Sequence, residues 1–264
     1  MKMNIGVAKG YSFWKIFSFK TMKSILISTI IRDRAKYLKE WYSQLIQLVQ
    51  NCKEYTFYIS VYENDSRDNS IDILKSLDFS IFKNVCIKSE ILDTKYYESI
   101  KNDERVVLLA DARNKSIYNC GFLDFCDEIL CIEPDIHYDP ALLSHLIKTH
   151  SYDIISARSG HVSYDPRDRR KIYDVWATRI LPSDEEWTGN FDINQDIIKV
   201  WSTFNCFCKY NALPFKNGVS FSGFSKRLNK YDCDTTVICE SFRQTGYDNI
   251  AIDLRQYVLH GQYD

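Results

Sequence analysis

The first half of the chain alternates short apolar runs with patterns typical of amphipathic helices. Residues 24–31 (S-I-L-I-S-T-I-I) and 55–62 (Y-T-F-Y-I-S-V-Y) are rich in β-branched and aromatic side chains, which predicts two strands. Residues 35–50, between them, predict a helix with four large apolar side chains on one face: Leu38, Trp41, Leu45 and Leu48. The same reasoning predicts a helix that begins after Asp68 or Asn69, strands at 85–91 and 128–132, a loop or short helix at 95–104, and a helix within 110–117.

Strands that alternate with helices indicate an α/β protein whose parallel sheet is covered on both faces. The second half of the chain is less regular. Its predicted elements are a strand at 152–157, a short apolar segment at 204–208, a helix at 235–244 that Asp234 caps and Gly246 ends, and a strand at 250–254. Neither an internal repeat nor a low-complexity linker interrupts the chain, which favours one continuous domain.

Composition narrows the classes of partner. The 264 residues carry a net charge of −1, so there is no electrostatic case for binding nucleic acid. No apolar run approaches the ~18 residues that a membrane span needs. The nine scattered cysteines fit buried thiols in a reducing compartment, which predicts a cytoplasmic location. Residues 1–22 interleave Lys with Phe, Trp and Ile without the features of a signal peptide. They predict either a peripheral contact with a membrane or a partner, or a leader or packed N-terminal arm.

A pair of carboxylates lies where the central apolar run ends. Residues 129–132 (I-L-C-I) predict a buried strand that stops at Glu133-Pro134-Asp135, because proline cannot donate to a sheet ladder. In open α/β sheets, ligands bind at the carboxyl ends of the strands. Carboxylate oxygens at that edge suit Mg²⁺ or Mn²⁺ held against a substrate diphosphate. The alternative is an acidic turn before the next helix, whose predicted N-cap is Asp139.

Polar side chains also mark the ends of the first two strands. Thr29 and Arg32 lie at the end of the first, and Glu63 and Asn64 follow the second. A carboxylate in such a position accepts a hydrogen bond from a ribose hydroxyl in dinucleotide folds, which predicts a nucleotide pocket. The segment E-N-D-S-R-D-N-S (63–70) is also typical of a polar turn between a strand and a helix, so both interpretations stand.

The order of these segments resembles a GT-A glycosyltransferase and, more narrowly, family 69, the α-1,3-mannosyltransferases of fungal capsule synthesis. The matching segments are Y-I-S-V-Y-E-N-D-S-R-D-N-S (58–70), L-L-A-D-A-R-N (108–114), E-I-L-C-I-E-P-D-I-H-Y-D-P (128–140), Y-D-I-I-S-A (152–157), Y-D-V-W-A-T-R (173–179), F-N-C-F (204–207) and D-C-D-T-T-V-I-C-E-S-F (232–242). The resemblance implies a single Rossmann-like GT-A domain over residues 23–264 with a mixed, mostly parallel sheet. A nucleotide-sugar half would extend to about residue 140, and an irregular acceptor-binding half would follow.

The activity that the resemblance implies is metal-dependent transfer of a sugar from a nucleoside-diphosphate sugar to a hydroxyl group of a carbohydrate acceptor. Mannose is the favoured sugar, GDP or UDP the nucleotide, and retention the expected stereochemistry. One alternative is a non-catalytic subunit that binds a nucleotide sugar or a glycan. Another is a nucleotidyltransferase, which usually has a glycine-rich loop after its first strand, whereas residues 28–36 contain no glycine.

The resemblance also assigns roles to single residues. Asp135 and Glu133 would bind Mn²⁺ or Mg²⁺, with His260 as a further ligand, although a lone histidine is as easily a surface or core residue. Candidate nucleotide contacts on the first half, besides Glu133, are Thr29, Arg32, Glu63, Asn64, Arg113 and Asn114. Candidate acceptor-binding residues are Tyr173, Trp176 and Asn205, and the catalytic candidates are Asp135, Asp174 and Asp234. For Trp176 a core position, and for Asp234 a plain N-cap, are the alternatives.

Overall fold

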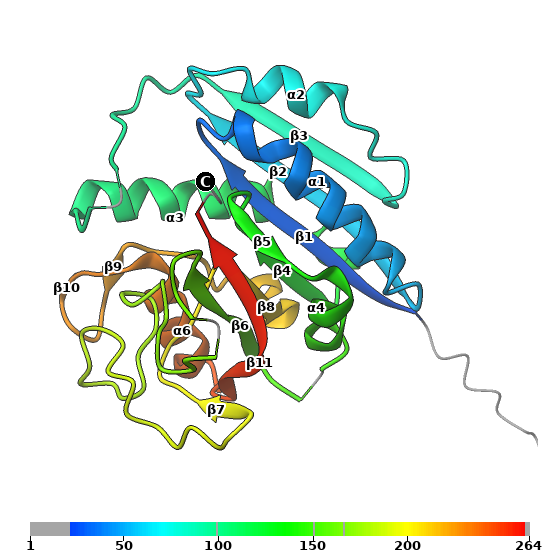
Figure 1. Cartoon of the computed structure of the whole chain (residues 1–264). Helices are drawn as coiled ribbons and strands as arrows, with labels where there is room; N and C mark the ends of the chain where they lie inside the picture. The colour runs from blue at the N-terminus through cyan, green and yellow to red at the C-terminus, as the bar shows by residue number, and fades with distance from the viewer. Residues whose placement is uncertain (1–21, 99, 150, 166, 262–264) are drawn as a thin grey trace, which may run out of the picture.

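The computed structural model describes residues 22–98, 100–149, 151–165 and 167–261. Its centre is a nine-stranded sheet in the order β3-β2-β1-β4-β8-β6-β11-β5, with β7 paired to β11 beside this path (Figure 1). The strands are β1 (Lys23–Ile31), β2 (Tyr55–Asn64), β3 (Asn84–Glu90), β4 (Glu128–Ile132), β5 (Ile136–Tyr138), β6 (Ile154–His161), β7 (Ile197–Lys199), β8 (Phe207–Asn211) and β11 (Ile250–His260). β9 (Phe224–Ser225) and β10 (Lys230–Tyr231) form a separate hairpin.

The pairing confirms a mixed, mostly parallel sheet. β1, β2, β3, β4, β6 and β11 run in one direction, while β5, β7 and β8 run against them. The carboxyl ends of β1, β2, β4, β6 and β11 therefore lie along one edge of the sheet. This is the edge at which open α/β sheets bind their ligands.

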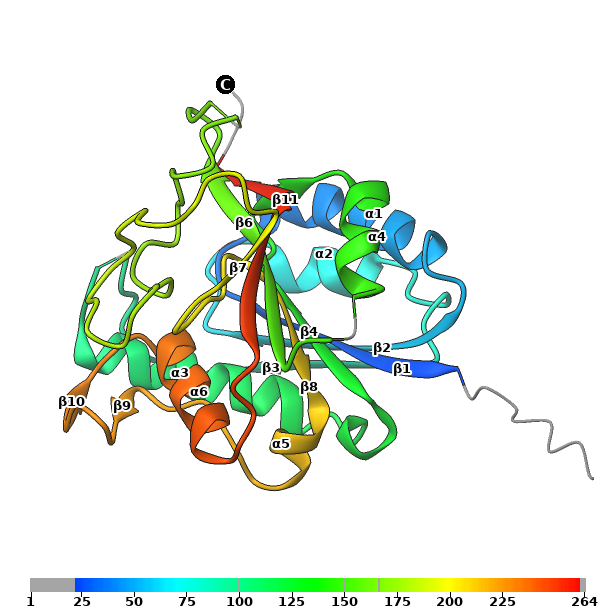
Figure 2. The same cartoon turned by 90° about the horizontal axis from the view of Figure 1, so that it is seen from below.

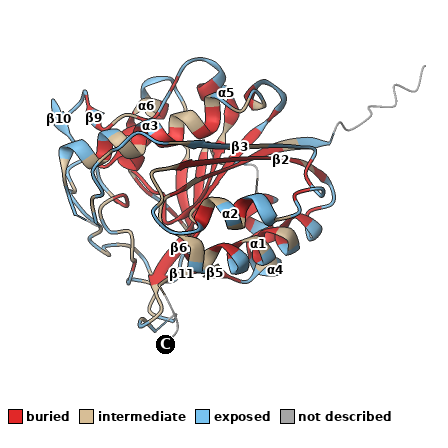
Figure 3. Ribbon diagram, turned by 90° about the horizontal axis from the view of Figure 1, so that it is seen from above, coloured by how far each residue is buried: buried red, intermediate tan, exposed pale blue. Residues whose placement is uncertain are grey.

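Helices cover both faces of the sheet (Figures 2 and 3). One face carries α1 (Ala35–Gln50), α2 (Ser70–Ser76) and α4 (Pro140–Ile147), and the other carries α3 (Asp103–Tyr118), α5 (Ala212–Lys216) and α6 (Asp234–Gln244). A short 3-10 helix, η1 (Leu123–Phe125), precedes β4. Each layer of helices closes one of two hydrophobic clusters that share the sheet as their centre.

The first half follows its hydrophobic pattern closely. The predicted helix at 35–50 is α1, and all four side chains of its apolar face are at most 1% exposed: Leu38, Trp41, Leu45 and Leu48. Asp139 caps α4 as predicted, since its carboxylate accepts from the backbone N–H groups of Ala141 and Leu142 at 2.8 and 3.3 Å. These contacts fix the chain on either side of β4 and β5.

Two predictions about elements were wrong in extent or detail. The helix predicted at 110–117 is part of a longer helix, α3, which begins at Asp103 and whose N-cap Asn102 accepts from the N–H of Arg105 at 3.1 Å; of the loop or short helix predicted at 95–104, the described residues before Asp103 are loop. α5 and β5 did not stand out in the hydrophobic pattern, because both are short. Asp234 is not the N-cap of α6, because Cys233 occupies that position without a side-chain hydrogen bond.

β11 is the element whose length matters most for the site. The strand predicted at 250–254 continues to His260, because it pairs with β6 along one side and with β7 and then β5 along the other. At its end, His260 is in register with Ile136 of β5 and His161 of β6. This pairing brings the last described part of the chain beside the segment that follows β4.

Residues 1–22 were predicted to form an aromatic and basic extension, and apart from Met22 they lie outside the described residues. The proposed membrane contact falls on the same segment and is not tested. Within the part of the chain that the structure describes, no helix is both long enough and apolar enough to cross a membrane.

Candidate active site

The carboxylates of Glu133 and Asp135 point to different partners. Asp135 is 6% exposed, and its Oδ2 accepts from Nε of Arg34 at 2.9 Å. The same oxygen lies 3.3 Å from Nε2 of His260. Glu133 instead accepts at Oε1 from Nη2 of Arg113 at 2.8 Å. The rigid proline between the two acidic residues thus separates one carboxylate that faces β11 from another that faces α3.

His260 is held in place by more than its strand. Its ring stacks on that of Tyr173, with centroids 4.0 Å apart and planes 12° apart. Burial would raise the pKa of Asp135, but His260 and then Arg34 outweigh it and hold that pKa below its usual value. Asp135 is therefore an anion at neutral pH, next to an imidazole whose orientation is fixed by an aromatic ring.

The geometry fits a divalent cation held by two protein ligands rather than three. The predicted set of Glu133, Asp135 and His260 does not converge, and the described residues contain no group of three or more His, Cys, Asp or Glu side chains placed to hold a metal. Mg²⁺ and Mn²⁺ in phosphate-transfer sites typically use one or two protein ligands, with substrate phosphates and water completing the set. The neighbouring carboxylate and imidazole of Asp135 and His260 match that arrangement.

Arg113 joins three elements beneath the carboxylate pair. It is 8% exposed, and besides Glu133 it donates from Nε to Oδ2 of Asp234 at 2.9 Å. Its guanidinium also lies over the ring of Phe204, 4.3 Å from the centroid. The prediction of a phosphate contact is not what the structure shows, because Arg113 is occupied by two carboxylates. Asp234, predicted as a cap or catalytic residue, is the buried partner of this arginine.

Asp174 borders the same cluster. Its Oδ2 accepts from the backbone N–H of Asn205 at 3.1 Å. Burial raises the pKa of Asp174 to about 6, against the lowering effect of the Asn205 N–H group, and the negative charge of Glu133 adds to the rise. A carboxyl group with this pKa exchanges its proton near neutral pH, which is a property of groups that transfer protons in active sites.

A cavity of about 140 Å³ opens at the ends of β1, β2 and β4, and we call it the strand-end cavity. Its lining includes three arginines and three tyrosines among 18 residues: Ile30, Ile31, Arg32, Arg34, Tyr62, Asn64, Leu92, Thr94, Lys95, Tyr96, Tyr97, Arg105, Leu108, Leu109, Asp111, Ala112, Glu133 and Pro134. Arginines can bind phosphate oxygens in a bidentate manner, and tyrosine rings can stack on a base. Arg34, which contacts Asp135 as well, was not singled out from the sequence because nothing in its local pattern marks it.

Residues 92–94 contribute to the lining of the strand-end cavity, and we call them its roof. Asp65, which was not among the candidate site residues, holds this roof in place. Asp65 adopts a positive φ of 56° and accepts from the backbone N–H groups of Leu92, Asp93 and Thr94. Burial would raise the pKa of Asp65, but hydrogen bonds from Thr94 and Asn64 lead the effects that lower it far below the usual value. Arg32 donates to the carbonyl of Thr94 at 2.7 Å and to its hydroxyl at 2.9 Å.

Three predicted nucleotide contacts have other roles in the structure. Thr29 is 1% exposed inside β1 and does not line the strand-end cavity. Glu63 holds the turn after β2, since it accepts from the N–H of Ser66 at 2.8 Å and from the hydroxyl of Ser89. Asn114 binds the backbone of Phe221 through both ends of its amide, at 2.9 Å each. The turn interpretation of Glu63 is the one that its hydrogen bonds support, whereas Arg32 and Asn64 do line the cavity.

Of the predicted acceptor-binding residues, one lies at the site and two have other surroundings. Tyr173 stacks on His260 at the site. Asn205 is fully buried, with its amide bonded to Ser159 at 2.7 Å and Thr203 at 2.8 Å, so in this structure it holds the loop. Its φ of 53° turns the chain so that Cys206 accepts from the N–H of Glu133 at 2.9 Å. Trp176 is partly exposed and lies near the start of α3, where Nζ of Lys101 is 5.5 Å from its ring centroid.

Comparison with known proteins adds to this geometry. A family model described as cryptococcal mannosyltransferase 1 matches residues 24–240. Among solved structures, TarS from S. aureus is similar at 14% identity with a TM-score of 0.50, over 88% of this chain and 35% of that one. TarS 1-349 in complex with UDP gives 13% identity and a TM-score of 0.51, over 88% and 57% of the two chains. These likenesses show the GT-A fold that the sequence implied.

A further solved structure is the mannosyltransferase PcManGT from Pyrobaculum calidifontis in complex with GDP-Man and Mn²⁺. It has 10% identity and a TM-score of 0.48, over 88% of this chain and 56% of that one. The chain spans less than two thirds of the length of each of these structures. No curated protein matches the sequence.

Proposed function

The chain belongs to the cryptococcal mannosyltransferase 1 family of glycosyltransferases, and from this premise we propose that it transfers a sugar from a nucleoside-diphosphate sugar to a hydroxyl group of a carbohydrate. The single observation that carries the proposal is the meeting of Asp135 and His260, 3.3 Å apart, at the sheet edge beside the strand-end cavity. The buried carboxylate and the imidazole come from segments far apart in the sequence, and charged groups that meet beside a cavity in this way are characteristic of ligand sites.

The donor occupies the strand-end cavity in this proposal. The rings of Tyr62, Tyr96 and Tyr97 would pack against the nucleoside, and Arg32 and Arg34 would face the diphosphate. TarS 1-349, which shares the fold, has been solved with UDP. The cavity offers no group that separates GDP from UDP, so the nucleobase is an outcome of the experiment below.

Asp135 and His260 would hold a divalent cation, Mn²⁺ or Mg²⁺, against the diphosphate. When bound, such a cation would neutralise the negative charge that develops on the leaving diphosphate. Arg34 touches Asp135 and is placed to add a second positive charge near the same oxygens. Tyr173 fixes the His260 ring, so the ligand would be oriented before substrate arrives.

Asp174 and the Arg113–Asp234–Glu133 cluster would lie below the reacting sugar. Asp174, with a pKa of about 6, can hold or release a proton beside the incoming hydroxyl group. The cluster would keep Glu133 in place as one wall of the strand-end cavity. Mannose as the sugar and retention as the stereochemical outcome are the finer parts of this proposal, and they rest on the family resemblance. So does the glycan acceptor. A cytoplasmic location is also part of the proposal, supported by nine free thiols.

A donor screen tests the function. The protein with Mn²⁺ is incubated with GDP-mannose, UDP-glucose and UDP-xylose, and the release of free nucleotide is measured for each. We expect one nucleotide sugar to be hydrolysed, with a rate that falls at least ~100-fold in Asp135→Asn, as expected when an electrostatic contact at the reacting centre is removed. Nucleotide binding without release from any donor, with or without glycan acceptors, would instead support a non-catalytic binding subunit.

A further inference from the structure

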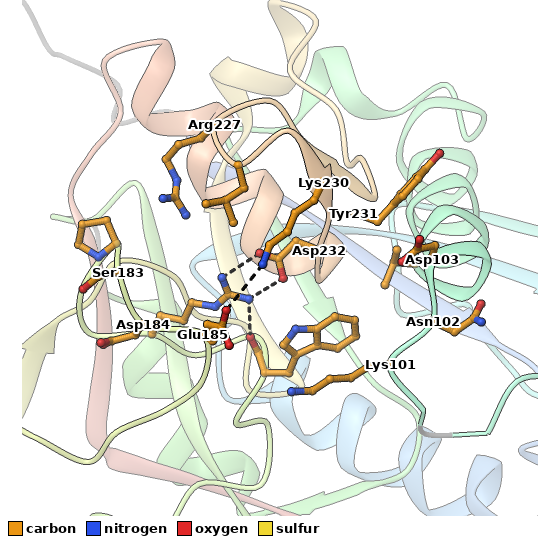
Figure 4. A pocket seen from close by; sticks show the side chains of 15 residues that line it. Lys101, Asn102, Asp103, Ser183, Asp184, Glu185, Arg227, Lys230, Tyr231 and Asp232 are labelled. Carbon is orange, nitrogen blue, oxygen red and sulfur yellow. Dashed lines mark hydrogen bonds and ion pairs between the residues drawn. The ribbon is translucent and has the colours of Figure 1, made fainter.

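A second cavity lies beyond Asp174 and Asp234, between the start of α3 and the β9–β10 hairpin, and we call it the hairpin cavity (Figure 4). Its volume is about 370 Å³, within the ~300–1,000 Å³ range of sites for small ligands. In Figure 4, Asn102, Asp103 and Tyr231 lie on one side of it, and Ser183 and Arg227 lie on the other. The function proposed above does not use this cavity.

Two chain segments connect the hairpin cavity directly to the carboxylate cluster. Trp176 lines the cavity and comes two residues after Asp174. Asp232 lines it too and comes two residues before Asp234. Because two extended residues span at most about 7 Å, the cavity begins within roughly one sugar ring of the cluster. The strand-end cavity has no lining residue in common with it, so the two are separate cavities.

The charges of the hairpin cavity balance. Four cationic side chains (Lys101, Arg179, Arg227 and Lys230) and four anionic ones (Asp103, Asp184, Glu185 and Asp232) line it. Most of the cationic groups already have carboxylate partners.

Arg179 donates to both oxygens of Asp232 at 2.8 and 2.6 Å, and Arg227 contacts Glu240 at 2.8 Å. An anionic ligand would have to displace one of these carboxylate partners, and a ligand of either charge would leave the balanced cavity with an uncompensated charge, whereas a neutral ligand does neither. Paired carboxylate and guanidinium groups retain free lone pairs and N–H groups, and these suit hydroxyl groups, which both donate and accept.

Two aromatic rings complete this chemistry. Tyr231 is 45% exposed, and its ring packs edge-on against Phe224 at 5.4 Å, which fixes its position. Trp176 provides the other ring. Exposed aromatic faces among hydroxyl-binding groups are suited to the apolar C–H face of a pyranose, while the many charged groups exclude an acyl chain.

We propose that the hairpin cavity binds an uncharged oligosaccharide, the acceptor chain, next to the hydroxyl group that receives the sugar. This assignment rests on the proposed function. It places donor and acceptor in separate cavities that both adjoin the Arg113–Asp234–Glu133 cluster, since Glu133 lines the strand-end cavity and Asp232, two residues before Asp234, lines the hairpin cavity. It also gives the acceptor a substrate class, namely a neutral glycan, as opposed to a uronic-acid chain, an amino sugar or a lipid.

The test is saturation-transfer NMR on the full chain with three probes: mannotriose as the neutral sugar, methyl glucuronide as the anionic one and glucosamine as the cationic one. We expect mannotriose to bind, and glucuronide and glucosamine to bind more weakly. In Trp176→Ala and Tyr231→Ala the affinity for mannotriose should fall about fivefold, the order of one lost aromatic contact. Phe125→Ala is the matched control, because this ring is 64% exposed on η1, before the amino end of β4.

Three results would overturn the proposal: no binding of mannotriose, equal binding by the Trp176 and Tyr231 variants and the wild type, or preference for a charged probe. Affinity for GDP and UDP, measured on the same variants, shows that each variant is folded. Nucleotide release from donors in water, measured on the wild type, distinguishes a failure of the hairpin-cavity assignment from a failure of the proposed function. Release without mannotriose binding contradicts the hairpin-cavity assignment alone. Mannotriose binding without release from any donor contradicts the proposed function and leaves a neutral-glycan site.

Discussion

The two halves of the domain build their shares of the site by different means. Before residue 148, strands and helices alternate, and the polar residues at the strand ends mostly hold the chain's own turns, as Asp65 and Glu63 do. After β6, the described residues of 162–196 (all but 166) contain neither helix nor strand, and the chain there is held by buried ion pairs such as Arg179 with Asp232. Yet Asp174, Tyr173 and His260, all from this second half, are among the residues nearest to the proposed chemistry.

The comparison shows where the stability of the site resides. Apolar burial fixes the sheet edge in the first half, and it would do so whatever the ligand. The second half continues the same sheet through the β4–β8 and β5–β11 pairs and shares both hydrophobic clusters with the first half. At the site, charged contacts between the halves add to this attachment: Arg113 to Asp234, and Asp135 to His260. Charged contacts of this kind depend on pH, and losing one partner leaves the other charge buried and unpaired, whereas apolar side chains do not titrate.

The largest effect should come from removing the arginine that joins the halves. Arg113→Ala leaves Glu133 and Asp234 without their partner, and breaking a buried pair in this way typically costs about 3–5 kcal/mol of unfolding free energy. Arg167→Ala is the control, because that arginine is 88% exposed in its pair with Asp165, and such exposed pairs contribute little to stability. Urea unfolding measures both. A loss for Arg113→Ala as small as that of the control would mean that the halves do not depend on this contact.

The next effect concerns pH. Because burial raises the pKa of Asp174 to about 6, the folded state binds its proton more tightly than the unfolded chain does. The unfolding free energy should therefore fall as the pH rises from about 4 to 6 and stay low above that. Asp174→Asn removes this dependence, so at pH 7.5 the variant should be more stable than the wild type by on the order of 1–3 kcal/mol.

Thermal unfolding at pH 4.5 and 7.5 measures the effect of Asp174→Asn, with the exposed Asp165→Asn as the control. If Asp174→Asn is less stable than the wild type at pH 7.5, the carboxyl group is an ordinary paired anion and not a proton carrier. Transfer activity of the same variant would then report only the loss of a structural contact.

A smaller effect separates the two acidic residues after β2. Asp65→Ala releases the roof of the strand-end cavity and should weaken binding of GDP or UDP by about 1–2 kcal/mol, the order of hydrogen bonds to a charged group. Glu63→Gln should leave nucleotide affinity unchanged and lower stability, because its partners are Ser66 and Ser89. Calorimetric titration decides between them, with the exposed Asp72→Ala on α2 as control. If Glu63→Gln weakens nucleotide binding and Asp65→Ala does not, the roles given to these two residues are reversed.

Sequence reasoning succeeded where local pattern determines structure. The apolar period of α1, the cap at Asp139 and the β-branched run of β1 are each set by neighbours within a few residues. The same holds for the turn after β4, because Pro134 stops the ladder wherever the rest of the chain lies. The carboxylate pair could thus be placed at the sheet edge in advance.

Sequence reasoning failed where the partner of a side chain is distant in the sequence. Asp234 has the local pattern of an N-cap, yet it binds Arg113, 121 residues away. Asn114 looks available for a ligand but is used by Phe221, 107 residues away. β11 was predicted too short because Arg255 and Gln256 interrupt its apolar pattern, although strands on both sides pair with it. In each case the information lies in tertiary contacts and not in the local sequence.

The central claim is that Asp135 and His260 together hold a divalent cation against a nucleoside diphosphate. Electron paramagnetic resonance of Mn²⁺, titrated into the protein with GDP or UDP present, measures this directly. Asp135→Asn and His260→Ala should each weaken Mn²⁺ binding by about tenfold or more, since even indirect partners of a metal site account for 10–100-fold. His145→Ala, on the exposed side of α4, should bind as the wild type does. Wild-type affinity in both Asp135→Asn and His260→Ala would contradict the account.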